Sequence, residues 1–122
     1  MVKPILGIIG GGQLGSMLAT AAKKLEIKTV IFSDDPDAPA QKFSDKFVYG
    51  NYDDQSVINQ FTNIADIITF EFENIPYEAL SKINKIKPVL PSPSINKIIQ
   101  NRLYEKDFIN KLNIRTTQYT SI

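Results

Sequence analysis

The chain alternates between short runs of consecutive apolar residues and stretches in which apolar residues recur every three or four positions. The first run, Ile5 to Ile9, predicts a buried strand. The spacing that follows predicts an amphipathic helix with a single apolar stripe. The members of this stripe are Leu14, Met17, Leu18, Ala21, Ala22 and Leu25.

The same alternation continues as far as Leu90, with four more strand-like runs and two more helical patterns. Asp53 or Asp54 is expected to cap the first of these helices, and Pro76 to lie near the start of the second, which runs through Ile86. The strand-like runs are Lys28 to Phe32, Phe47 to Tyr49, Ile67 to Phe70 and Val89 to Leu90.

Strands that alternate with helices favour a parallel sheet with helices on both faces. Ligands of such sheets bind beyond the carboxyl ends of the strands. Three polar or glycine-rich segments directly follow predicted strands, so we expect them at one common rim. They are Gly10 to Gly15, the loop that begins near Asp34, and Glu71 to Asn74.

The last part of the chain has a different pattern. Ser94 is expected to cap one long helix, and Ile114 to Tyr119 then alternates like the start of a new strand. We therefore predict two domains, with residues 1–93 as the first and residues 94–122 as a linker helix and the start of a second. The apolar side of the long helix comprises Ile95, Ile98, Ile99, Leu103 and Leu112.

The glycines of Gly10-Gly11-Gly12-Gln13-Leu14-Gly15 stand between a predicted strand and a predicted helix. Such a turn presents backbone N–H groups at a helix start, where negative charge is favoured. The spacing fits the dinucleotide fingerprint, and Asp34 lies near the distance of a ribose-binding carboxylate. This supports an NAD(P)-binding module, whereas the alternative is a turn that only packs a helix closely on the sheet.

Glu71 and Glu73 lie two residues apart at the end of a predicted strand, which would point both to the same face. Paired carboxylates can hold amine donors, bind Mg²⁺ or transfer protons. Glu73 is the preferred functional candidate, because Asn74 and Pro76 restrict the chain directly after it. The alternative is that one carboxylate caps the next helix and the other is solvated.

Other charged groups have simple structural interpretations. Asp34, Asp35 and Asp37 are spaced by prolines and are typical of turns. Arg102 can pair with Glu105 on a solvated helix face or reach a phosphate across a domain boundary.

Composition narrows the chemistry further. The 122 residues contain 14 Lys and Arg against 13 Asp and Glu, so neither nucleic acid nor an anionic membrane is an expected partner. Cysteine and histidine are both absent, which removes disulfides, thiolate and imidazole metal sites and a Ser-His-Asp triad. The apolar segment at the amino terminus is too short to span a bilayer, so a cytoplasmic location is expected.

Together these segments resemble the amino-terminal part of the 5-(carboxyamino)imidazole ribonucleotide synthases, which are ATP-grasp ligases of purine biosynthesis. The resemblance runs through the whole chain, and the order and spacing of its motifs carry it. The matching motifs are Gly10 to Leu18, Asp35 to Ala40, Tyr52-Asp53-Asp54, Thr69 to Pro76 and Asn101 to Lys106.

The resemblance implies a Rossmann-like pre-ATP-grasp domain, with a parallel sheet flanked by helices, and the first helix of an ATP-grasp module. It implies a reaction in which ATP, Mg²⁺ and bicarbonate carboxylate aminoimidazole ribonucleotide through carboxyphosphate, and it leaves a homodimer of the longer protein open. It implies substrate contacts at Gly11, Gly12, Gln13, Leu14 and Glu73. Arg102 would belong to the ATP site.

Two departures from the family pattern matter. Ser16 stands where the family usually has a basic residue, and family members are much longer, with their ATP-gripping lysines and Mg²⁺ ligands beyond Ile122. We therefore expect a truncated fragment that holds no catalytic residue and no metal ligand. By itself it should be inactive and bind no cofactor tightly.

Overall fold

The computed structural model describes residues 2–122, so Met1, the first residue of the predicted amino-terminal domain, lies outside it. Four parallel strands form one sheet in the order β3-β2-β1-β4. Their bounds are Leu6–Ile9 for β1, Thr29–Ser33 for β2, Lys46–Tyr49 for β3 and Ile67–Phe70 for β4. The predicted parallel α/β fold is confirmed.

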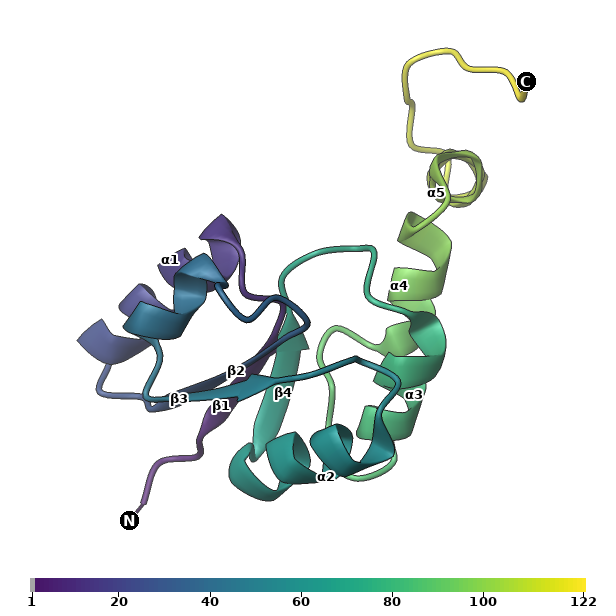
Figure 1. Ribbon diagram of the computed structural model, residues 1–122. Helices are drawn as coiled ribbons and strands as arrows, with labels where there is room; N and C mark the ends of the chain where they lie inside the picture. The colour runs from purple at the N-terminus through teal and green to yellow at the C-terminus, as the bar shows by residue number, and fades with distance from the viewer. Residues whose placement is uncertain (1) are drawn as a thin grey trace.

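Helices cover both faces of the sheet (Figure 1). Helix α1 (Gln13–Lys24) and the short 3-10 helix η1 (Pro39–Phe43) lie on one face. Helices α2 (Gln55–Ile64) and α3 (Tyr77–Asn84) lie on the other. The predicted cap of α2 is Asp54, whose carboxylate accepts hydrogen bonds from the N–H groups of Ser56 and Val57.

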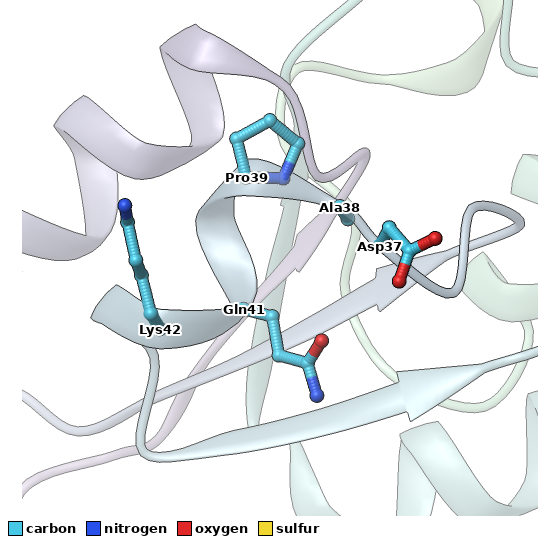
Figure 2. Close-up of a pocket in the computed structure, with 5 residues that line it drawn as sticks. All are labelled: Asp37, Ala38, Pro39, Gln41 and Lys42. Carbon is cyan, nitrogen blue, oxygen red and sulfur yellow. The ribbon is translucent and has the colours of Figure 1, made fainter.

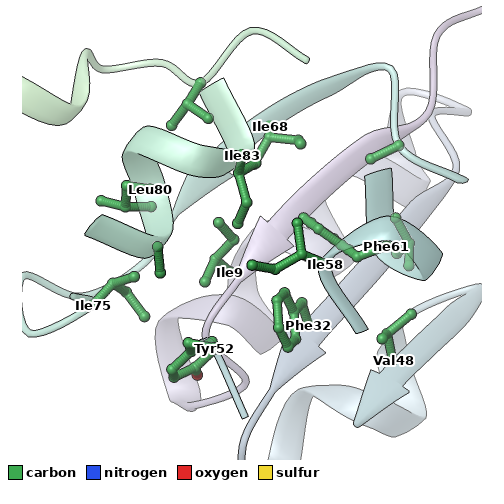
Figure 3. Packing of buried hydrophobic residues seen from close by; sticks show 14 residues of the cluster. Ile9, Phe32, Val48, Tyr52, Ile58, Phe61, Ile68, Ile75, Leu80 and Ile83 are labelled. Atoms are coloured by element: carbon green, nitrogen blue, oxygen red, sulfur yellow. The ribbon is translucent and has the colours of Figure 1, made fainter. Parts of the chain in front are cut away.

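The alternation of side chains along each strand divides the core into two parts. Ile9 and Phe32 point toward α2 and α3, whereas Ile8 and Ile31 point toward α1 and η1. Phe32 is central to the larger cluster, because its ring lies 5.2 Å from that of Phe61 and 5.1 Å from that of Tyr52 (Figure 3). This core fixes the register of β1 against β2 and β4, and with it the rim described below.

Most of the apolar stripe predicted for α1 faces solvent, and Ala22 is its one buried member. The helix packs on the sheet through Gly15, Ala19 and Ala22, whereas Leu14 and Met17 are 57% and 60% exposed. The reason is spatial: small residues let the helix backbone approach the sheet and η1 closely, so the larger side chains of the same helix lie outside.

The predicted fifth strand is reduced to one bridge between Val89 and Ile68. The predicted long helix is also wrong, since the chain forms α4 (Pro93–Ile99) and α5 (Arg102–Lys111). Asn101 separates them because its extended backbone lets its side chain accept hydrogen bonds from the N–H groups of Leu103 and Tyr104.

Helix α4 begins one residue before the expected cap, Ser94, and packs against α3. Helix α5 packs against α4 and buries none of its own residues. Residues 112–122 form no strand, which corrects the expectation for Ile114 to Tyr119. Among residues 2–122, no helix combines the length and apolar character that crossing a membrane requires.

Candidate functional site

The carboxyl ends of β1 and β4 lie side by side and bring two predicted segments together. Ile9 and Phe70, the last residues of these strands, are register partners. The glycine turn begins directly after Ile9 and the acidic segment directly after Phe70. The expected common rim therefore exists for the glycine turn and for Glu71. The loop after β2 adjoins it, because the N–H of Ala40 donates to the carbonyl of Gly11.

The glycines of this turn make room for atoms of the chain itself. Gly10 has a φ of +105°, and a Cβ added there would lie 2.5 Å from Cγ of Glu71. A Cβ on Gly12 would lie 3.1 Å from Oε1 of Glu71. A Cβ on Gly11 would lie 2.5 Å from Cβ of Ala38. Close packing, the simpler interpretation of the turn, accounts for each of these glycines.

Glu71 supplies the negative charge that the turn favours. The N–H of Gly12 donates a hydrogen bond to Oε1 of Glu71 over 3.2 Å. Gly12 is the N-cap of α1, a helix with no acidic residue in its first turn and no side-chain cap of its own. The carboxylate of Glu71, the first residue after β4, thus complements the positive end of the α1 dipole.

Sequence reasoning preferred Glu73, and the structure places the two carboxylates differently. Strand β4 ends at Phe70 and the chain bends at Glu71, so the two residues are not on one extended strand. Glu71 is half-buried on the glycine turn, whereas Glu73 is exposed. Because β4 lies beside β1, the first residue after β4, Glu71, lies next to the glycine turn. The sequence offers no signal of that strand order.

An apolar depression adjoins Glu71. It has a volume of about 360 Å³ and is lined by Leu14, Met17, Leu18, Phe70 and Glu71. The exposed side of α1 forms one wall, and the end of β4 forms the other. Such a surface can accept a flat ring against its aliphatic side chains and an N–H donor at the carboxylate.

The aspartates after β2 form a turn. Oδ1 of Asp35 accepts a hydrogen bond from the N–H of Asp37, and Oγ of Ser33 accepts one from the N–H of Asp35. Asp34 is exposed. Burial, and to a lesser degree the nearby charge of Asp34, raise the pKa of Tyr52 to about 12.

A second depression lies over η1 and is lined by Asp37, Ala38, Pro39, Gln41 and Lys42. Figure 2 shows its polar side chains pointing in different directions. A ligand site needs polar groups that converge. This depression is therefore a weaker candidate than the one beside Glu71.

Arg102 begins α5, and its guanidinium donates a hydrogen bond to Oε2 of Glu105 over 2.8 Å. The Arg102 side chain is 78% exposed. This geometry matches the solvated pair, and contact with a nucleotide stays a prediction. Within residues 2–122, no three His, Cys, Asp or Glu side chains come together as a metal-binding group.

The chain is similar to known proteins over most of its length. Residues 2–100 match the family model described as the ribonucleotide synthetase preATP-grasp domain. The N5-carboxyaminoimidazole ribonucleotide synthase of Staphylococcus epidermidis is 35% identical over 117 residues, which cover 96% of this chain and 31% of that protein. The chain thus spans about a third of that relative's length.

Solved structures agree with this match. The N5-carboxyaminoimidazole synthetase of Staphylococcus aureus complexed with ADP superposes with a TM-score of 0.83 at 34% identity, covering 90% of this chain and 30% of that one. The Aspergillus clavatus synthase in complex with ADP and 5-aminoimidazole ribonucleotide gives a TM-score of 0.82 at 29% identity. It covers 95% of this chain and 31% of that one.

Proposed function

Because this chain belongs to the ribonucleotide synthetase preATP-grasp domain family, we propose that it is the substrate-side part of an ATP-dependent ligase. The ligase would carboxylate the exocyclic amine of 5-aminoimidazole ribonucleotide in purine biosynthesis. The names of the relatives support this proposal, although the chain spans only about 31% of the first of them.

The observation that carries the proposal is the Glu71 carboxylate on the glycine turn. One oxygen of Glu71 accepts the N–H of Gly12, and the carboxylate retains lone pairs for other donors. The apolar depression beside it suits a flat heterocycle. A ligand bearing amine N–H groups therefore fits this rim better than a ligand that would place a phosphate there.

The predicted site residues then have distinct roles. Gly12 leaves room for Glu71, and Gly11 leaves room for Ala38. Gln13 can offer its side-chain amide at the start of α1. Leu14, which is 57% exposed, forms part of the apolar wall. Glu73, exposed two residues beyond Glu71, would accept a second donor from the aminoimidazole.

We propose that ATP, Mg²⁺ and bicarbonate act with parts of the longer ligase, which would be a homodimer. ATP would activate bicarbonate as carboxyphosphate. The described residues offer no cluster for Mg²⁺, and Arg102 alone does not form a phosphate site, so no step of phosphoryl transfer is assigned to this chain. Arg102 would contribute to the nucleotide side after releasing Glu105.

The NAD(P)-binding alternative is not favoured. The dinucleotide fingerprint needs the N–H groups of the turn for a pyrophosphate, and Glu71 occupies the N–H of Gly12. The matched family is one of ribonucleotide synthetases.

Ligand titration of the ¹⁵N-labelled chain tests the proposal. Aminoimidazole ribonucleotide should shift the amide resonances of Gly12, Gln13 and Glu71, and Glu71→Gln should weaken that response. Glu78→Gln, which removes an exposed carboxylate from α3, is the matched control. Micromolar binding of NADH with no response to the ribonucleotide would reverse the assignment.

An activity assay provides a second test. The purified chain should show no bicarbonate-dependent ATP hydrolysis above background, with or without aminoimidazole ribonucleotide. Positioned cations around the ATP phosphates are needed for that step. Robust turnover would contradict the restriction of this chain to the substrate side.

A further inference from the structure

The loop from Glu71 to Pro76 is attached to the rest of the chain at both ends. At its start, the N–H of Glu71 donates to the carbonyl of Ile9 and its carboxylate accepts from Gly12. At its end, Ile75 is fully buried. Of the three residues between them, Phe72 is half-buried, whereas Glu73 and Asn74 are exposed. The position of the exposed part therefore depends on what holds Ile75.

Two side-chain amides from α4 hold the carbonyl of Ile75. Nδ2 of Asn96 donates to this oxygen over 3.0 Å, and Nε2 of Gln100 donates to the same atom. The two donors are separated by 21 and 25 residues from Ile75. The carbonyl thus uses both of its lone pairs on one helix that follows the sheet in sequence.

The orientation of Asn96 is set by this contact. Asn96 is completely buried, and its Oδ1 has no hydrogen-bond partner among residues 2–122. Exchanging Oδ1 and Nδ2 would place two acceptor oxygens against each other. A buried asparagine that leaves one atom unpartnered while directing the other at Ile75 points to a role at that carbonyl.

The same helix leads directly to the predicted nucleotide side. Gln100 is the C-cap residue of α4, Asn101 caps α5, and Arg102 is the first residue of α5. The residue that contacts the Ile75 carbonyl is therefore two positions from Arg102. The covalent chain between them leaves little freedom for one to move without the other.

We propose that Asn96 and Gln100 are positioning residues, whose amides clamp the carbonyl of Ile75 and thereby set where the Glu71 to Pro76 loop presents its carboxylates. The clamp also fixes this loop relative to the start of α5. Its relevance to substrate rests on the proposed function, whereas the clamp itself is a property of this chain. A ligand that moves α5 would also move the Glu71 to Pro76 loop.

NMR spectroscopy of the 122-residue chain tests the clamp without any substrate. In Gln100→Leu, the carbonyl carbon of Ile75 should shift upfield because it loses one donor. The amide proton of Gly12 should also shift, because Glu71 lies at the other end of the same loop. Local opening of the loop should become roughly two- to tenfold more frequent, as expected for the loss of one hydrogen bond. Gln60→Leu, the same change at an exposed position of α2, is the matched control.

A conservative variant separates positioning from general stability. In Gln100→Glu the ionised carboxylate cannot donate at neutral pH, but the protonated acid can donate at acidic pH. The Ile75 carbonyl resonance should therefore move back toward its wild-type position as the pH falls, with the wild-type chain measured at each pH. Unchanged Ile75 and Gly12 resonances in Gln100→Leu, or no recovery in Gln100→Glu, would overturn the proposal. Neither result depends on what the rim binds.

Discussion

Substituting Gly10 by alanine tests whether the glycine turn is shaped for Glu71. The substitution forces an alanine to φ +105° and places its Cβ 2.5 Å from Cγ of Glu71. Backbone strain of this kind costs about 1–3 kcal/mol, and overpacking of a filled site costs about 1–3 kcal/mol more. We expect Gly10→Ala to lower the free energy of unfolding by about 2–6 kcal/mol in total.

A double-mutant cycle divides this cost into its two parts. The three nearest neighbours of the added Cβ are all atoms of the Glu71 side chain beyond Cβ. In a Glu71→Ala background only the backbone strain should remain, so the cost of Gly10→Ala should fall to about 1–3 kcal/mol. Urea denaturation with linear extrapolation measures each corner of the cycle.

The control for this cycle is Gly12→Ala. Its backbone φ of −79° suits alanine, and its added Cβ meets Oε1 of Glu71 at a looser 3.1 Å. This variant should be milder than Gly10→Ala. Equal costs of Gly10→Ala with and without Glu71 would refute the idea that the turn is built around that carboxylate.

Three further predictions concern the rest of the chain. Ultraviolet titration should show one tyrosine that ionises near pH 12, because burial raises the pKa of Tyr52 to about 12, and this transition should be absent in Tyr52→Phe. The stability that the neutral phenol contributes is present below the unfolded pKa of about 10 and is lost as the pH rises through 12. Hydrogen bonds from Ser56 and Val57 lower the pKa of Asp54. The contribution of the Asp54 carboxylate to stability should therefore be present above its unfolded pKa and disappear as the pH falls through the lower folded pKa. The melting temperature of Asp54→Ala should differ most from that of the wild-type chain near neutral pH. In α1, Met17→Lys should change the free energy of unfolding by less than about 0.5 kcal/mol, whereas Ala22→Leu should cost about 1–3 kcal/mol because Ala22 faces the sheet. The reverse order in a denaturation experiment would place Met17 in the core.

The elements that sequence predicts well are those with strong local signals. The apolar run that ends at Ile9 and the capping carboxylate of Asp54 each determine local structure through neighbours in the chain. The parallel order follows from the alternation of strands and helices. These features need no knowledge of the distant packing.

The elements that sequence misses depend on that packing. Hydrophobicity alone assigns Met17 to the core, but steric fit gives that place to the smaller Gly15 and Ala19. The contact between Glu71 and the glycine turn likewise depends on the position of β4 beside β1, which the local sequence does not indicate. Asn101 is a typical helix-capping residue and indicates the break between α4 and α5. The apolar periodicity that continues across Asn101 nevertheless favours a single helix.

The segment around Val89 closes one edge of the sheet. It pairs with β4 only at Ile68, through the hydrogen bonds from Ile68 N–H to the Pro88 carbonyl and from Leu90 N–H to the Ile68 carbonyl. Pro88 and Pro91 stand on either side and have no N–H to continue a ladder. The Val89 segment therefore covers this edge of β4, and its flanking prolines prevent a strand of another molecule from continuing the ladder. This arrangement protects β4 from edge-to-edge aggregation.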